Sequence, residues 1–140
     1  MIKLFISQPM HGLSDEEVVL ERNRIVEKFV EAMKVQYPIV DVKVAVVNDL
    51  FRPYAPANAS RLWYLTEAIR DLEIADVVIF TKGWKTASGC KVERCVVEQY
   101  QSMFDDRLVL CEGVTGWYYM NKEVCKRLGI QEATGSFAWS

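Results

Sequence analysis

Apolar and polar positions follow two different periods along most of the chain. Short continuous apolar runs predict buried strands, because a strand covered on both faces needs no polar alternation; they lie at residues 2–7, 40–47, 77–80 and 108–111. Between them apolar residues recur every three or four positions, which predicts helices over residues 15–35, 60–72 and 88–103. This alternation predicts a single α/β domain over residues 1–140, a flavodoxin-like open parallel sheet of four or five strands with helices on both faces.

Polar residues mark where the predicted helices begin. Ser14 precedes three acidic residues and Ser60 precedes the second helix, so both serines are expected to be N-caps. The predicted apolar stripes are Val18, Ile25, Phe29 and Met33 in the first helix, Leu62, Leu65, Ile69 and Leu72 in the second, and Val92, Cys95, Val96 and Met103 in the third. A short helix is expected over residues 122–128, and the aromatic tail after it is expected to dock, with another subunit as one candidate.

Composition limits the function classes that fit the chain. With 51% hydrophobic residues, 26% charged residues and a net charge of -2, we expect a soluble globular protein. Four cysteines expected to be free thiols, and no signal-peptide pattern at Met1, predict the reducing cytoplasm. Lys and Arg are scattered, so a nucleic-acid polymer is not an expected partner, and no apolar stretch reaches the length of a membrane span. The four cysteines form no C-x-x-C pair and lie far from the one histidine, His11, so no metal site is expected. We expect no cofactor either.

The predicted sheet also predicts where a ligand would bind. In open parallel sheets, ligands bind beyond the carboxyl ends of the strands, where the strand order reverses. The loops expected at that edge are residues 7–13, 48–58 and 81–87. The middle loop is long and contains two prolines, so we interpret it as a flap or rim over the site.

Four motifs occur in an order and spacing that resemble one protein family. They are Phe5-Ile6-Ser7-Gln8-Pro9-Met10-His11-Gly12, Ala75-Asp76-Val77-Val78-Ile79-Phe80, Gly83-Trp84, and Ser88-Gly89 followed after three residues by Glu93. Together they resemble the nucleoside 2-deoxyribosyltransferase-like superfamily and, within it, a group of small bacterial and phage proteins. The resemblance covers residues 1–111 and leaves the rest of the chain unassigned.

The resemblance implies a flavodoxin-like fold, usually homo-oligomeric, that acts on a nucleoside or nucleotide. Such proteins cleave the N-glycosidic bond, or transfer the deoxyribosyl group, through a nucleophilic glutamate whose position Glu93 matches. Its carboxylate would attack the anomeric carbon and form a glycosyl-enzyme. A place near the amino end of a helix favours the ionised carboxylate that this step needs. The alternative is that Glu93 is a solvated residue on the helix surface.

The superfamily's transferases also carry an acidic residue on the second helix, which handles the proton of the base. This sequence does not align cleanly there: Asp71 is the first candidate, Glu67 the second and Asp76 the third. Asp71 could equally form a surface pair with Arg70 or a capping interaction. Without such a group binding would remain and chemistry would be impaired. Non-catalytic binding of a nucleotide or nucleotide-derived ligand in the same pocket is therefore an alternative function, and an interaction protein that uses the aromatic tail is a third.

Substrate contacts are expected from residues in and beside these motifs: Ser7, Gln8, Pro9, Met10, Gly12, Gly83, Trp84, Ser88 and Gly89. Each has a structural alternative. Ser88 can cap a helix, Trp84 can be a packing residue, and the first loop can be a proline-glycine turn. Arg22 lies on the apolar stripe of the first helix and is expected to reach either a structural carboxylate or a phosphate ligand. Cys90 and Cys95 are expected to be small core residues.

Overall fold

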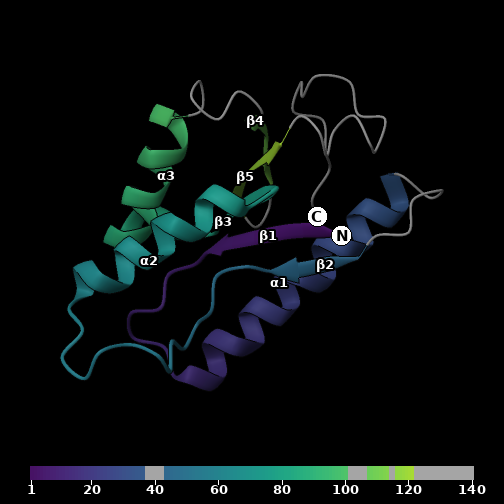
Figure 1. Ribbon diagram of the computed structural model, residues 1–140. Helices are drawn as coiled ribbons and strands as arrows, with labels where there is room; N and C mark the ends of the chain where they lie inside the picture. Colours follow the sequence, from purple (N-terminus) through teal and green to yellow (C-terminus); the bar gives the residue numbers. More distant parts are fainter. Residues whose placement is uncertain (37–42, 101–106, 114–115, 122–140) are drawn as a thin grey trace.

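The computed structural model describes residues 1–36, 43–100, 107–113 and 116–121, which form five strands and three α-helices (Figure 1). In chain order they are β1 (Ile2–Ser7), α1 (Asp15–Gln36), β2 (Val44–Val46), α2 (Arg61–Ile74), β3 (Val77–Thr81), the short 3₁₀-helix η1 (Trp84–Thr86), α3 (Ser88–Tyr100), β4 (Arg107–Gly113) and β5 (Gly116–Asn121). The predicted aromatic tail, the short helix before it and Met103 lie outside the described residues.

The strands form one sheet in the order β2-β1-β3-β5-β4. β1 pairs in parallel with β2 on one side and with β3 on the other, where Ser7 lies opposite Phe80. β5 is antiparallel to both β3 and β4. The predicted α/β fold with a parallel sheet is therefore confirmed for three strands, whereas four or five parallel strands are not confirmed. The strand β5 was not predicted.

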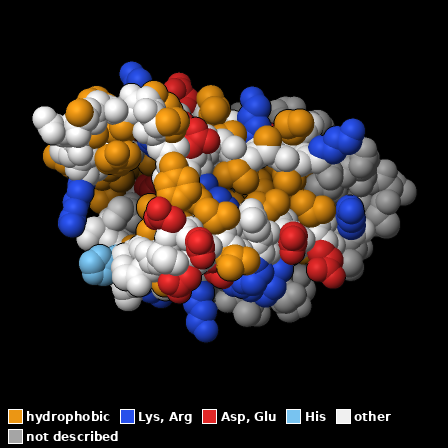
Figure 2. All heavy atoms as spheres, turned by 90° about the horizontal axis from the view of Figure 1, so that it is seen from below, with side chains coloured by type: hydrophobic (Ala, Val, Ile, Leu, Met, Phe, Trp, Pro, Cys, Tyr) orange, Lys and Arg blue, Asp and Glu red, His pale blue; other side chains and the backbone are white. Residues whose placement is uncertain are grey.

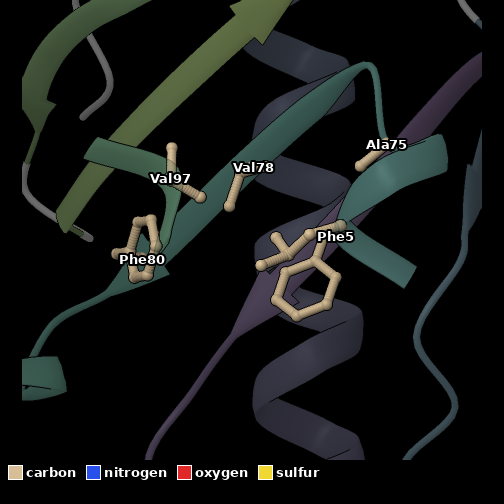
Figure 3. Close-up of a cluster of buried hydrophobic side chains, with 6 residues drawn as sticks. Phe5, Ala75, Val78, Phe80 and Val97 are labelled. Carbon is tan, nitrogen blue, oxygen red and sulfur yellow. The ribbon is translucent and has the colours of Figure 1, made fainter. Parts of the chain in front are cut away.

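Helices cover both faces of the sheet: Figures 1 and 3 show α1 on one face and α2 with α3 on the other. The face toward α2 and α3 carries a buried cluster formed by Phe5, Leu72, Ala75, Val78, Phe80 and Val97 (Figure 3). The opposite helix, α1, buries its whole predicted stripe, with Val18, Ile25, Phe29 and Met33 at most 4% exposed. Every residue of β3 is buried, as expected for a strand covered on both faces.

Both predicted caps are confirmed. Ser14 and Glu17 bond reciprocally, since the Glu17 amide donates to Ser14 Oγ and the Ser14 amide donates to Glu17 Oε1, each at 3.1 Å. This is a capping box, which satisfies two amides that a helix start leaves unpaired. Ser60 Oγ accepts the Trp63 amide at 3.1 Å at the start of α2.

Two predicted stripes are partly wrong. In α2, Leu72 is buried but Leu62 is 72% exposed. In α3, Val92 and Cys95 are exposed, and the buried face consists of Cys90, Glu93 and Val97. In α3 the reason is that the carboxyl group of Glu93 occupies a buried position, so the apolar residues of the sequence do not mark the buried face.

The face of the molecule seen from below the view of Figure 1 carries charges of both signs. Figure 2 shows Lys and Arg side chains interspersed with Asp, Glu and apolar side chains on this face. Among the described helices, none combines the length and apolar character that crossing a bilayer requires.

Candidate functional site

A cavity of about 110 Å³ lies at the carboxyl end of β1. Five parts of the chain contribute to its lining. They are Gln8 after β1, Arg22 on α1, Asn48, Asp49 and Arg52 after β2, Tyr64 and Ala68 on α2, and Glu93 on α3. The chain runs from β1 outward to β2 and then back across to β3, so this is the edge at which the strand order reverses. A polar cavity therefore lies where the sequence predicts the site.

Glu93 points into this cavity and is only 8% exposed. Ser7, the last residue of β1, is 2% exposed and donates its hydroxyl hydrogen to Glu93 Oε1 at 2.9 Å. The alternative in which Glu93 is a solvated surface residue is wrong. A serine at a strand end and a glutamate of the neighbouring helix are joined across 86 positions of sequence.

Burial dominates the protonation of Glu93 and raises its pKa to about 7. The Ser7 hydrogen bond and the charges of Arg22 and Arg52 act in the opposite direction, and Asp71 adds to the rise. The expectation that the helix amino end would keep this carboxyl ionised is therefore outweighed, because removal from water disfavours the charged form more strongly. Both protonation states are populated near neutral pH.

Arg22 is a buried scaffold residue beside the cavity. Its Nε donates to Gln8 Oε1 at 2.7 Å, one terminal nitrogen donates to the Ile6 carbonyl at 3.1 Å, and the other donates to the Asn48 carbonyl. Burial lowers its pKa to about 10, so it stays charged at neutral pH. Among the described residues these hydrogen-bond acceptors are neutral oxygens, so the expected carboxylate is not one of them. Glu93 is nevertheless close enough to favour the charge on Arg22.

Asn48 connects β1 to the loop that follows β2. Its Oδ1 accepts the Ile6 amide at 2.9 Å and its Nδ2 donates to the Ile6 carbonyl at 2.8 Å. The side-chain amide thereby makes the two bonds that a neighbouring strand would make. This fixes the start of the loop against the cavity.

Asp71 is held by Arg52. Arg52 Nη2 donates to Asp71 Oδ2 at 2.7 Å, and the two side chains are 6% and 20% exposed. The alternative of a surface pair with Arg70 is wrong, because Asp71 pairs with Arg52 and Arg70 lies 3.8 Å from Glu67. Asp71 does not line the cavity itself, but its charge acts on Glu93.

Asp76, the third candidate for the second acid, lies at the opposite edge of the sheet. Its carboxylate accepts the Lys3 amide at 2.9 Å and its own amide donates to the Lys3 carbonyl at 2.8 Å. These bonds join the amino ends of β1 and β3, whereas the cavity lies at the carboxyl end. Asp76 therefore has no access to a ligand beside Glu93.

The first predicted loop contributes Gln8 and Met10 to the cavity lining. Gln8 is 6% exposed and also donates to the Val18 carbonyl at 3.2 Å, whereas Met10 is 51% exposed at the mouth. Pro9 lies against Gly83, where an added Cβ would stand 3.7 Å from Pro9 Cγ. The loops after β1 and β3 are thus neighbours, as expected at one edge of a parallel sheet. Gly12 is exposed with φ of 80°.

The predicted contacts after β3 lie outside the cavity lining. The Trp84 ring packs edge-on against Phe80 at 6.0 Å between centroids, and the Arg94 guanidinium lies 4.4 Å from its centre, which matches the packing interpretation. Ser88 and Gly89 are exposed in the first turn of α3.

The first helical bond of α3 runs from the Lys91 amide to the Ala87 carbonyl at 3.0 Å. Ala87 is therefore the N-cap, and the capping interpretation of Ser88 is wrong.

Sequence reasoning missed Asn48, Asp49, Arg52 and Tyr64 as individual residues, although it identified the loop that holds the first three as a rim. Cys90 is 3% exposed, and burial raises its pKa to about 11, so it is a protonated core thiol as predicted. Cys95 is exposed, contrary to prediction. Within the described ranges, no three His, Cys, Asp or Glu side chains are grouped so that they could hold a metal ion.

A second concave surface runs along α1, lined by Asp15, Glu16, Val19, Leu20 and Phe51. It is larger than the cavity at Glu93 but shallow and mostly apolar, and the two share no lining residue. Specific binding of a small polar ligand needs convergent polar groups, which the Glu93 cavity offers.

Comparisons of the chain with protein-family models, curated proteins and solved structures found no match. The cavity at Glu93 is therefore the candidate functional site on its own geometry.

Proposed function

We propose that the protein cleaves the N-glycosidic bond of a deoxynucleoside or nucleotide, or transfers its deoxyribosyl group, with Glu93 as the nucleophile. One observation carries the proposal: a carboxyl group, 8% exposed and held by a serine hydroxyl, faces a polar cavity at the switch point of a parallel sheet. Burying a carboxylate costs free energy and does not help the fold, so such a group is a candidate for chemistry.

The Ser7 hydrogen bond supports a nucleophilic role by fixing the orientation of the carboxylate. In the proposed reaction Glu93 Oε1 stays with Ser7 while Oε2 attacks C1 of the sugar, so the N-glycosidic bond breaks and its electron pair leaves with the base. The leaving base takes up a proton. Water or a second base then attacks C1 of the glycosyl-enzyme, gives up a proton of its own and releases Glu93. The ionised form of Glu93 is the reactive one.

The size of the cavity favours a sugar ring inside and a base at the mouth. A volume of about 110 Å³ is smaller than the roughly 300 Å³ at which pockets for whole small molecules begin. Met10 and Tyr64, 51% and 44% exposed, would then border the base. The strand order β2-β1-β3 is also that of the flavodoxin-like arrangement, which we propose for the parallel part of the sheet.

Asp71 is the residue we propose for handling the proton of the base. It lies on α2 behind Arg52, and its charge acts on Glu93. Asp71→Asn would then lower the rate of base release and leave binding intact.

The test is incubation of the protein with a panel of nucleosides, deoxynucleosides and their monophosphates, with free base and thermal stabilisation measured together. Wild type should release base from at least one deoxyribosyl compound. Glu93→Gln, which keeps the size and the Ser7 contact, should reduce that release by about a thousandfold or more, as loss of a nucleophile does. Equal turnover by the two proteins would rule out the nucleophilic role.

Non-catalytic binding of a nucleotide or nucleotide-derived ligand is the second candidate. It is favoured by the observation that Asp71 is paired with Arg52 and does not line the cavity, so that among the described residues Glu93 is the one helix carboxylate in the lining. A ligand that raises the melting temperature of wild type without any release of base would support this function.

A further inference from the structure

Arg52 connects the loop after β2 to Asp71 on α2 and lies beside the cavity that Glu93 faces. Its side chain is 6% exposed and lines the cavity that Glu93 faces. One terminal nitrogen donates to Asp71 at 2.7 Å and the other donates to the Tyr54 hydroxyl at 2.8 Å. A guanidinium held by two side chains has little freedom to move, so its charge occupies a fixed place next to the cavity.

Hydrogen-bonding, charged or titratable groups from five parts of the chain bond to Glu93, line its cavity or act on its charge. Ser7 on β1 is neutral and bonds directly. The remaining groups are Arg22 on α1, Asp49 and Arg52 on the loop after β2, Asp71 on α2, and the thiol of Cys90 on α3.

The two arginines differ in how their charge is used. Arg22 donates to neutral carbonyl and amide oxygens, so its positive charge is not neutralised by these acceptors. Arg52 is paired with a carboxylate, so part of its field at Glu93 is cancelled by Asp71. The Arg52 and Asp71 pair therefore acts on Glu93 as two opposite charges, of which only the arginine lines the cavity.

We propose that Arg52 is a positioning residue that favours the charged form of the Glu93 carboxylate, and that Asp71 fixes Arg52 in place while weakening its effect. The consequence for turnover rests on the proposed function, because only a charged carboxylate attacks a sugar carbon. The electrostatic part concerns the free protein and needs no substrate.

The two members of the ion pair should shift Glu93 in opposite directions. The loss of a positive neighbour disfavours the carboxylate, so Arg52→Gln should raise the pKa of Glu93 by about one unit or more. Asp71→Asn removes a negative neighbour and leaves Arg52 uncompensated, so the same pKa should fall. An ion pair with a merely structural role would give shifts of the same sign from both variants, or none, because both lose the same contact.

The measurement is a titration of side-chain carboxyl signals by ¹³C nuclear magnetic resonance on the free full-length protein, with the Glu93 signal assigned from its absence in Glu93→Gln. Arg52→Lys keeps the charge and should stay near the wild-type midpoint. Arg70→Gln is the matched control, because this exposed arginine lies next to Asp71 in sequence and 3.8 Å from Glu67. If Arg52→Gln does not fold, Asp71→Asn and Arg52→Lys still decide the matter.

An unchanged midpoint in Arg52→Gln, or a rise in Asp71→Asn, would overturn the inference. Its failure is distinguishable from failure of the proposed function. Opposite shifts in a protein that releases no base would leave the electrostatic role standing and reject the enzyme. Base release whose acid limb does not follow the Glu93 titration in Arg52→Gln would keep the enzyme and reject the role of Arg52.

Discussion

Glu93 and Val97 stand one helical turn apart on the buried face of α3, and the contrast between them separates fold from function. Val97 is 2% exposed and packs in the cluster with Phe5, Val78 and Phe80, whereas Glu93 is 8% exposed and faces Ser7 and the cavity. Both lie on the same side of the helix and both are removed from water. Stability of the fold explains the valine and does not explain the glutamate.

The energies of the two positions have opposite signs. Burial of a valine side chain stabilises the folded protein by about 1.5–3 kcal/mol. For Glu93, a pKa raised from 4.5 to about 7 means that the ionised form is destabilised by about 3 kcal/mol in the folded protein relative to the unfolded chain. A position that opposes folding at neutral pH and is surrounded by fixed polar groups is best explained by a task other than packing.

The largest effect is expected when a carboxylate is placed in the apolar half of this helix face. Val97→Asp should lower the free energy of unfolding by more than about 4 kcal/mol, because the charge would be buried in the cluster without a partner. Urea denaturation measures this change. The control Gln99→Asp changes an exposed residue of the same helix and should stay within about 0.5 kcal/mol of wild type. Similar losses in both variants would mean that Val97 is not buried in solution.

The next effect is expected from the opposite exchange, removal of the charge at Glu93. The unfolded chain ionises this group near 4.5 and the folded protein near 7, so the unfolded state binds fewer protons in this range and stability falls as pH rises. Glu93→Gln removes this loss and should be more stable than wild type by up to about 3 kcal/mol at pH values above the folded pKa, with the gain vanishing at about the unfolded pKa.

Urea denaturation of both proteins across this pH range, extended below the unfolded pKa, tests the prediction. Glu17→Gln serves as the control of opposite sign, because the bonds from Ser14 lower the pKa of Glu17 and its carboxylate therefore stabilises the folded state as pH rises. A wild-type protein and a Glu93→Gln variant with parallel pH dependence would show that Glu93 is not desolvated.

The smallest effect is expected at Ser7, which touches Glu93 without carrying charge. Ser7→Ala should cost about 1–2 kcal/mol of stability at high pH, because the buried carboxylate loses its hydroxyl donor, and should raise the pKa of Glu93 above that of wild type. Thr66→Ala removes an exposed hydroxyl that donates to the Leu62 carbonyl at 2.7 Å and should change stability by less than about 0.5 kcal/mol. The two losses are compared by urea denaturation, and the pKa by carboxyl titration.

How far sequence reasoning reached depended on whether local pattern and burial agreed. In α1 they agreed, because Val18, Ile25, Phe29 and Met33 keep a helical period behind a capping box. In α3 they disagreed, because the buried face carries Glu93 and the apolar count therefore favoured Val92 and Cys95, which are exposed. The strand β5 was missed because the residues between it and β4 are Val114-Thr115, which are not the residues of a typical tight hairpin.

Some residues of the site could be predicted from the sequence and others could not. The order of strands and loops was enough to bring Ser7, Gln8, Met10 and Glu93 to one edge. Arg52 and Asn48 could not be placed from the sequence, because they lie in a loop without periodicity. The path of that loop is set by contacts with Asp71 and Ile6 that are distant along the chain.

The side-chain amide of Asn48 replaces the backbone of β2 as the hydrogen-bonding partner of β1 at Ile6. β2 is only three residues long, yet the strand beside it extends further, and one side chain completes its hydrogen bonding where the neighbouring backbone has already turned away. At this point the Arg22 guanidinium donates to the Ile6 carbonyl, and Ile6, Arg22 and Asn48 all line the cavity. Because β2 ends after three residues, the loop that follows it can turn away from β1 and form one wall of the cavity.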